Sequence, residues 1–260
     1  RVLCLAGAVL AALVSGAAVR AQEARVPGAV YDVDRPNEKP MPAPKHDISG
    51  IWEPARGPGD AIQANGARAN PADGQHPLPF TAAGRAAYQS HKPAFGENMV
   101  PSALSNDPVP NCDPQGFPRV VLHNFRTSQI VQTPQQVLVL YEFNHKWRNI
   151  WADGRALPKL DDALEPRWWG YSAGKWQDDY TFVAESHGFD DRTWLDNAGR
   201  PHSNQMRVIE TYRRIDREHL ELSVTIDDPK FYTKPWVALD RLRLRLQPAS
   251  FDIRDRKSVV

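Results

Sequence analysis

The chain has 260 residues, with 32 lysines and arginines against 31 aspartates and glutamates and a formal net charge of +1 at pH 7. This balance argues against a nucleic-acid partner, because a nucleic-acid-binding protein normally carries a concentrated basic face. Glycine-rich phosphate loops and Cys-x-x-Cys pairs are both missing from the sequence, so its motifs predict no cofactor and no resident metal.

The first 21 residues are typical of a secretory signal peptide. Arg1 precedes an apolar run over 2–19, and the small residue Ala21 stands before a polar break, which predicts cleavage after Ala21. A membrane-spanning helix is the alternative, but the run is barely long enough for one. We therefore expect a periplasmic or secreted protein with no membrane span in its mature form.

The last six residues, 255–260, match the in-frame translation of a common sequencing adapter. We expect them to be a scar that plays no part in the fold, with a genuine polar tail as the alternative. About 230 residues lie between the two predicted end segments, enough for one sizeable core with an elaborated arm.

Residues 22–117 predict a proline-rich arm that wraps a core. Proline lacks the backbone donor and biases its neighbour toward extended geometry, so 35–54 and 70–80 should hold no long helix or central strand. One short helix is expected within 80–91, where alanine dominates and Thr81 can cap the first turn.

Residues 118–254 predict a β-barrel domain, because short alternating segments follow one another with turn residues between them. The fold class is therefore all-β: an antiparallel up-and-down, lipocalin-like barrel or a strongly curved sheet, with a two-sheet sandwich as the main alternative. The expected strands are 119–123, 128–133, 136–143, 146–151, 168–176, 179–187, 206–213, 219–226 and 237–246.

One group of candidate site residues surrounds the strand 146–151. Alternation places Arg148 on one face of this strand and Trp147 and Trp151 on the other, while His145 lies at the turn before it. Asp153 and Arg155 follow the strand at its far end.

A second group lies further along the chain. Small residues beside Tyr171 leave room next to aromatic walls, which suits a flat or sugar-like ligand. Glu210 shares a strand face with apolar residues, so its carboxylate must be paired or protonated if that face is inside the barrel. Arg192, Trp194 and His202 belong to a polar stretch just before that strand.

The functional hypothesis is a small-molecule-binding barrel with an aromatic or carbohydrate-derived ligand. An enzyme version would be a lyase or hydrolase in which Glu210 or His145, with His202 nearby, transfers a proton and Arg148 and Arg192 stabilise an oxyanion. Trp147, Trp151 and Trp194 would then hold the substrate.

Other interpretations remain open. A non-catalytic binding or envelope-assembly module is the alternative, and a metal-dependent enzyme a third, although His145 and His202 lack metal-ligand spacing. The oligomeric state stays open. The structural interpretation of the polar stretch is that its side chains cap turns, form local ion pairs and plug the barrel end. Positions in the arm or at the surface are expected for His46, His76, His91 and His219, and a solvent-facing strand face for Arg241, Arg243 and Arg245.

Cys112 is left alone once Cys4 departs with the signal peptide. In an oxidising compartment, either its partner lay beyond the present sequence or the thiol is free and buried.

Several motifs together resemble a large family of exported, mostly uncharacterised proteins of soil bacteria. The segments are DISGIWEP at 47–54, NDPVPNC at 106–112, YEFNHKWRNIWADGR at 141–155 and GFDDRTWLDNAGRPHS at 188–203. The resemblance implies a cysteine partner for Cys112 in an acidic C-terminal strand, which this sequence lacks after Gln247.

Overall fold

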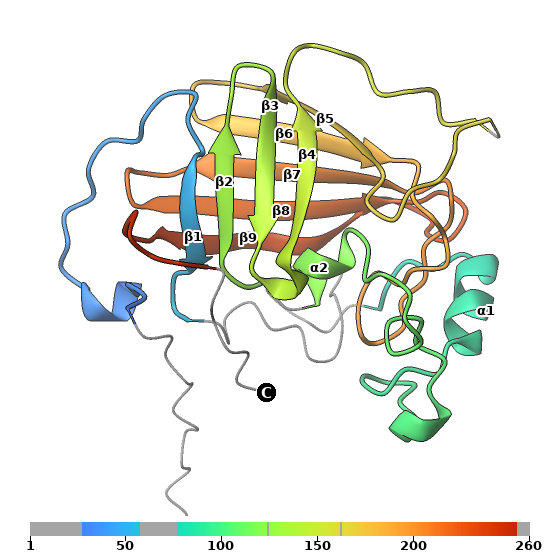
Figure 1. Cartoon of the computed structure of the whole chain (residues 1–260). Coiled ribbons are helices and arrows are strands. Elements are labelled where there is room, and N and C mark those ends of the chain that lie inside the picture. Colours follow the sequence, from blue (N-terminus) through green and yellow to red (C-terminus); the bar gives the residue numbers. More distant parts are fainter. Residues whose placement is uncertain (1–27, 58–76, 124, 162, 254–260) are drawn as a thin grey trace, which may run out of the picture.

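A computed structural model describes residues 28–57, 77–123, 125–161 and 163–253 of the chain. In these residues nine strands form one closed barrel in which each strand pairs with the next and β9 closes on β1 (Figure 1). The all-β barrel is thus confirmed. Because the barrel is closed, the two alternatives, an open curved sheet and a two-sheet sandwich, are excluded. The predicted signal peptide at 1–21 and adapter scar at 255–260 lie outside the described residues.

The strands follow the predicted alternation closely from β2 onward. Their bounds are β1 (Gly50–Pro54), β2 (Ser128–Gln132), β3 (Gln136–Tyr141), β4 (Lys146–Trp151), β5 (Tyr171–Trp176), β6 (Thr181–His187), β7 (Arg207–Arg214), β8 (His219–Asp227) and β9 (Trp236–Leu246). Side chains that alternate into the barrel form a continuous apolar core, which includes Trp52, Val139, Phe182, Leu222 and Leu244.

One strand contact differs from the purely antiparallel expectation. β4 and β5 run parallel and pair at Trp151 and Ala173, whereas the other neighbours in the barrel are antiparallel. A parallel pair needs a long crossover, which the connection 152–170 supplies. The barrel is therefore mixed.

The prediction that the proline-rich arm holds no central strand is wrong at β1. Gly50 to Trp52 pair with β2, and Trp52 to Pro54 pair with β9, so β1 completes the barrel wall. Pro54 is the last residue of β1. At this position the missing backbone donor of proline does not break a hydrogen-bond ladder that continues beyond it. Burial of the Trp52 side chain, which is 0% exposed, favours the strand over the local proline bias.

The expected strand at 119–123 is also wrong, because Arg119–Leu122 form the short helix α2. The amides of Val121 and Leu122 both donate to the carbonyl of Pro118, which starts the turn. All four α2 side chains are buried in a helical turn that closes one end of the barrel, so tertiary packing overrides the β-propensity of the two valines. Figure 1 shows α2 below β4.

The helix predicted in the arm is confirmed as α1 (Ala82–Ser90), which lies to one side of the barrel (Figure 1). Thr81 caps it by accepting a hydrogen bond from the amide of Gly84 at 3.0 Å. Short 3-10 turns occur at η1 (Asp32–Asp34), η3 (Ser102–Leu104) and η4 (Phe143–His145). No helix in the described ranges is long and apolar enough to cross a membrane.

Candidate functional site

A charged pair lies inside the barrel. Arg148 on β4 and Glu210 on β7 are 3% and 0% exposed, and the Arg148 Nη2 donates to Glu210 Oε2. The Tyr212 hydroxyl donates to Glu210 Oε1 at 2.7 Å. Glu210 therefore does face the interior, and of the two states that the sequence left open for a carboxylate there, paired or protonated, the structure shows the paired one.

Aromatic rings enclose this pair. The Phe117 ring lies 3.8 Å from the guanidinium carbon of Arg148, and Trp169 stacks on Tyr141 with ring centroids 6.0 Å apart. Burial raises the pKa of the Tyr141 hydroxyl. Burial alone would lower the pKa of Arg148, but the charge of Glu210, the neighbouring Tyr141 and Tyr212 and the hydrogen bond to Glu210 together outweigh it, and the pKa is raised. Arg148 is therefore cationic at any physiological pH.

Three polar atoms in this interior group have no hydrogen-bond partner among the described residues. They are Nε and Nη1 of Arg148 and the hydroxyl oxygen of Tyr141. Each buried group that forms no hydrogen bond costs about 1–3 kcal/mol. The barrel interior beside Arg148 and Tyr141 therefore holds hydrogen-bond donors for which the described residues supply no acceptor.

His202 does not join the interior pair. Its Nε2 lies 2.7 Å from the Thr193 hydroxyl, and its Nδ1 lies 3.2 Å from the Ser203 carbonyl oxygen. The ring is 2% exposed and touches Phe189 edge-on, and Phe189 in turn contacts Phe117. Burial lowers the pKa of His202 and keeps the ring neutral. The expected convergence of His202 on Glu210 is therefore wrong, because the polar atoms of His202 are used within its own loop.

His145 is also separate from the pair. It is the last residue of η4 and is exposed at the turn before β4. Alternation then directs the next strand residues to opposite faces, so Arg148 points inward while Trp147 is 65% exposed. The expected convergence of His145 on Glu210 is wrong for this reason.

Residues predicted to hold a ligand after β4 contact one another. The guanidinium carbon of Arg155 lies 3.6 Å from the Trp151 ring centroid, and its Nη2 donates to Asp153 at 2.6 Å. The hydrogen bond from Arg155 lowers the pKa of the exposed Asp153 carboxyl. One face of Trp151 is thus already covered by a cation from its own loop.

An arginine also covers a tryptophan ring where the loop after β6 meets Trp168, which precedes β5. Arg192 lies over Trp168 with 4.4 Å from its guanidinium carbon to the ring centroid, and it pairs with Asp190 at 2.8 Å. The Tyr171 hydroxyl donates to the Glu165 carbonyl at 3.0 Å. The Arg192 side chain is 61% exposed and its ion pair with Asp190 is local, which matches the structural interpretation of the polar stretch.

Trp194 is 4% exposed and lies under the arm instead of facing a ligand space. The ring of His91 stacks on it with centroids 4.5 Å apart, and the guanidinium carbon of Arg119 is 5.8 Å from its ring. Arg119 makes a two-bond ion pair with Asp107, at 2.6 and 2.8 Å. Trp194 therefore joins α2 to the arm, as expected for a plug at the barrel end.

Residues 170–174 read Gly-Tyr-Ser-Ala-Gly and match the pattern of a hydrolase nucleophile, a match that the sequence interpretation missed. Ser172 lies within β5, is 5% exposed and shares a hydrogen bond of 2.7 Å with Ser186. A nucleophile of this kind requires a strand-to-helix turn, so the match carries no catalytic serine here.

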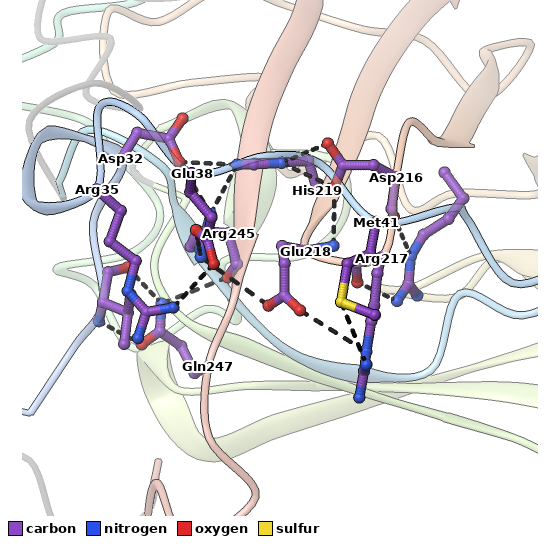
Figure 2. A network of polar contacts seen from close by, with 12 residues as sticks. Asp32, Arg35, Glu38, Met41, Asp216, Arg217, Glu218, His219, Arg245 and Gln247 are labelled. Atoms are coloured by element: carbon purple, nitrogen blue, oxygen red, sulfur yellow. Dashed lines mark hydrogen bonds and ion pairs between the residues drawn. The ribbon is translucent and has the colours of Figure 1, made fainter.

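A second polar group lies between the arm and the start of β8, and the sequence interpretation missed it (Figure 2). His219 Nδ1 lies 2.8 and 2.9 Å from the two carboxylate oxygens of Asp216, and its Nε2 lies 2.7 Å from Asp32 Oδ1. Arg245 reaches Glu38 at 2.5 Å. The hydrogen bond from Arg245 lowers the pKa of Glu38.

The surface positions expected for His219 and Arg245 are therefore wrong. These side chains are 8% and 2% exposed because arm residues 28–40 cover the outer face of β9. Gln247 fixes this segment through both backbone groups of Val30, at 2.6 and 2.9 Å. The acid three residues before His219 was the available sequence signal, but the approach of Asp32 depends on tertiary structure.

Cys112 is exposed and free, so the interpretation of a buried thiol is wrong. Within the described ranges, no group of three or more His, Cys, Asp and Glu side chains is placed to hold a metal ion.

Comparisons of the chain with protein-family models, curated proteins and solved structures found no match.

Proposed function

We propose that this chain is an exported, periplasmic or secreted, β-barrel that binds a small molecule in its interior beside Arg148 and Tyr141. The observation that supports the proposal is the set of buried Arg148 and Tyr141 polar atoms that have no partner in the described part of the chain. A ligand oxygen that accepts these hydrogen bonds offsets a cost of about 1–3 kcal/mol for each atom.

Charge balance favours a neutral ligand. Arg148 and Glu210 neutralise each other in a site where both side chains are at most 2% exposed. An anionic ligand would leave one uncompensated negative charge in a region of low polarity, and removal of an ion from water costs several kcal/mol there. The ligand that fits is therefore neutral and carries an acceptor oxygen, such as a carbonyl.

The surrounding rings favour a flat ligand. Phe117 and Trp169 present aromatic faces beside Arg148 and Tyr141, and such walls with a few polar groups are typical of small-molecule sites. An aromatic carbonyl compound combines both requirements.

The geometry favours binding over proton transfer. Both carboxylate oxygens of Glu210 already accept hydrogen bonds, one from Arg148 and one from Tyr212. His145, the other proposed proton carrier, lies on an exposed turn. The non-catalytic binding module is accordingly the better supported version of the hypothesis.

Calorimetric titration with benzamide and benzoate tests the proposal, since the two probes share a ring but differ in charge. We expect benzamide to bind and benzoate to bind more weakly. Tyr141→Phe removes one donor and keeps the ring, so it should weaken benzamide binding about five- to tenfold, which corresponds to about 1 kcal/mol.

Tyr171→Phe is the matched control, because the Tyr171 hydroxyl bonds to the Glu165 carbonyl outside the barrel. The proposal is wrong if neither probe binds, or if Tyr141→Phe and Tyr171→Phe reduce benzamide affinity equally. Ordered water would then be the group that satisfies the interior atoms.

A further inference from the structure

The outer face of β2, β3 and β4 carries no charged side chain, although charged residues make up 24% of the chain. Alternation along these strands turns one set of side chains into the apolar core and the other set outward. The outward set, which we call the β2–β4 face, consists of Gln129, Val131, Gln136, Leu138, Leu140, Trp147, Asn149 and Trp151. The outer face of β7–β9 differs, because it carries the exposed residues Arg207, Arg213, Arg241 and Arg243.

The pairing register places the apolar members of the β2–β4 face side by side. Leu140 lies opposite Trp147, and Leu138 lies opposite Val131. Trp147 and Val131 are 65% and 37% exposed, so the described chain leaves them open to solvent. A contiguous apolar surface with a polar rim is typical of an interaction site.

Uncharged amides accompany these apolar side chains. Gln129 lies opposite Leu140, on the side of Leu140 away from Trp147, and Gln136 lies opposite Trp151. A carboxamide supplies both a donor and an acceptor without a charge, which suits the hydroxyl groups of a sugar. The C–H face of a sugar ring is apolar and suits an exposed indole ring. The β2–β4 face therefore offers both chemistries that a neutral sugar ring presents.

The size of the β2–β4 face favours a narrow partner. Six residues at about 3.3 Å each and three strands at about 4.8 Å each give roughly 300 Å². A stable protein interface buries about 800 Å² on each partner, so a second copy of this chain would need far more surface than the face supplies. A polysaccharide chain is narrow enough to lie within it along the strands.

We propose that the β2–β4 face binds an extended, neutral polysaccharide, with one sugar ring stacked on Trp147 and hydroxyl groups bonded to Gln129 and Gln136. An acidic polysaccharide would bring carboxylates to a face that offers them no cation, so a neutral chain fits better. Arg155 covers one face of the Trp151 ring, which leaves Trp147 as the main stacking surface. This site is on the outside of the barrel and does not depend on the interior ligand.

Calorimetric titration of the full chain with cellohexaose, an extended neutral β-glucan fragment, tests this site. We expect saturable binding with a Kd on the order of 0.1–1 mM, and much weaker binding of glucose, which can occupy only one ring position. Trp147→Ala should weaken cellohexaose binding about tenfold, whereas Trp147→Phe keeps a flat ring and should stay within about threefold. Circular dichroism checks that each variant folds.

Tyr180→Ala is the matched control, because Tyr180 is an exposed aromatic residue, at 38%, that lies outside the β2–β4 face. It should leave cellohexaose affinity unchanged. Tyr141→Phe should also leave it unchanged, since Tyr141 faces the interior, and this separates the outer site from the proposed interior one.

The proposal is overturned if cellohexaose gives no saturable heat. It is also overturned if Tyr180→Ala or Tyr141→Phe weakens cellohexaose binding as much as Trp147→Ala does. Sedimentation velocity supplies the remaining arm of the test: a dimer that Trp147→Ala dissociates would identify a second copy of the chain as the occupant and would overturn the polysaccharide proposal.

Discussion

Removal of one partner from the interior ion pair should destabilise the barrel strongly. Arg148→Met leaves the Glu210 carboxylate at 0% exposure, with the Tyr212 hydroxyl as its remaining donor among the described residues. An uncompensated buried charge costs about 3–5 kcal/mol, so the free energy of unfolding should fall by that amount. Glu210→Gln should cost a similar amount, because the cation of Arg148 then has no anionic partner.

The double variant Arg148→Met with Glu210→Gln should be much less destabilised than the sum of the two single variants. It removes both charges, and the glutamine oxygen still accepts the Tyr212 hydroxyl. We expect the double variant to lie within about 2 kcal/mol of the unmodified protein. The coupling energy of this cycle should therefore exceed about 3 kcal/mol.

Urea unfolding followed by circular dichroism measures all four proteins of the cycle. The control cycle uses Arg207 and Glu185 on β7 and β6, an ion pair whose side chains are 47% and 39% exposed. Water screens this exposed pair, so its coupling should stay below about 1 kcal/mol. Additive losses at Arg148 and Glu210, or equal coupling in the two cycles, would refute the account of a dry interior pair.

Three further outcomes are expected. Burial lowers the pKa of His202 below its ordinary value of 6.5. The unfolded chain therefore binds more protons than the folded chain, so the free energy of unfolding should decline as the pH falls below about 6.5. His202→Gln should reduce this pH dependence, measured by acid unfolding, by up to about 1.4 kcal/mol per pH unit. Gly84→Ala should destabilise α1 despite the usual helix preference of about 1 kcal/mol for alanine, because the new Cβ would lie 2.1 Å from the Phe231 carbonyl oxygen; an unchanged or higher melting temperature would contradict this. Thr81→Ala should cost about 1 kcal/mol through loss of the cap on Gly84, and thermal unfolding equal to that of the unmodified protein would show that the cap is not needed.

The strands after residue 125 were predictable because their alternation is local. In β3 the odd-numbered residues Val137, Val139 and Tyr141 face the interior and are at most 4% exposed, as the pattern of apolar positions predicts. For Glu210 the sequence predicted a condition: if its strand face lies inside the barrel, the carboxylate must be paired or protonated. The identity of that partner was less accessible, because Arg148 comes from a strand that is distant in sequence.

The sequence predictions that were wrong concern residues whose structure depends on contacts between distant segments. β1 is a strand because β2 and β9 pair with it on either side, and no local signal in a proline-rich arm encodes those partners. Arg245 alternates with exposed arginines on β9, yet it is buried because Glu38 and Asp32 approach from the arm. Alternation predicts which face a residue occupies but not what covers that face.

The polar loop between β6 and β7 explains why composition alone gave a misleading site. Asp196 accepts from the amides of Ala198 and Arg200 at 2.9 and 3.3 Å, and Asp228 accepts from the amide and hydroxyl of Ser203 at 2.6 and 2.8 Å. A loop buried this deeply must satisfy its backbone groups internally, so it is rich in short polar side chains for structural reasons. Such a loop and a ligand site have the same residue types, so residue composition alone cannot distinguish one from the other.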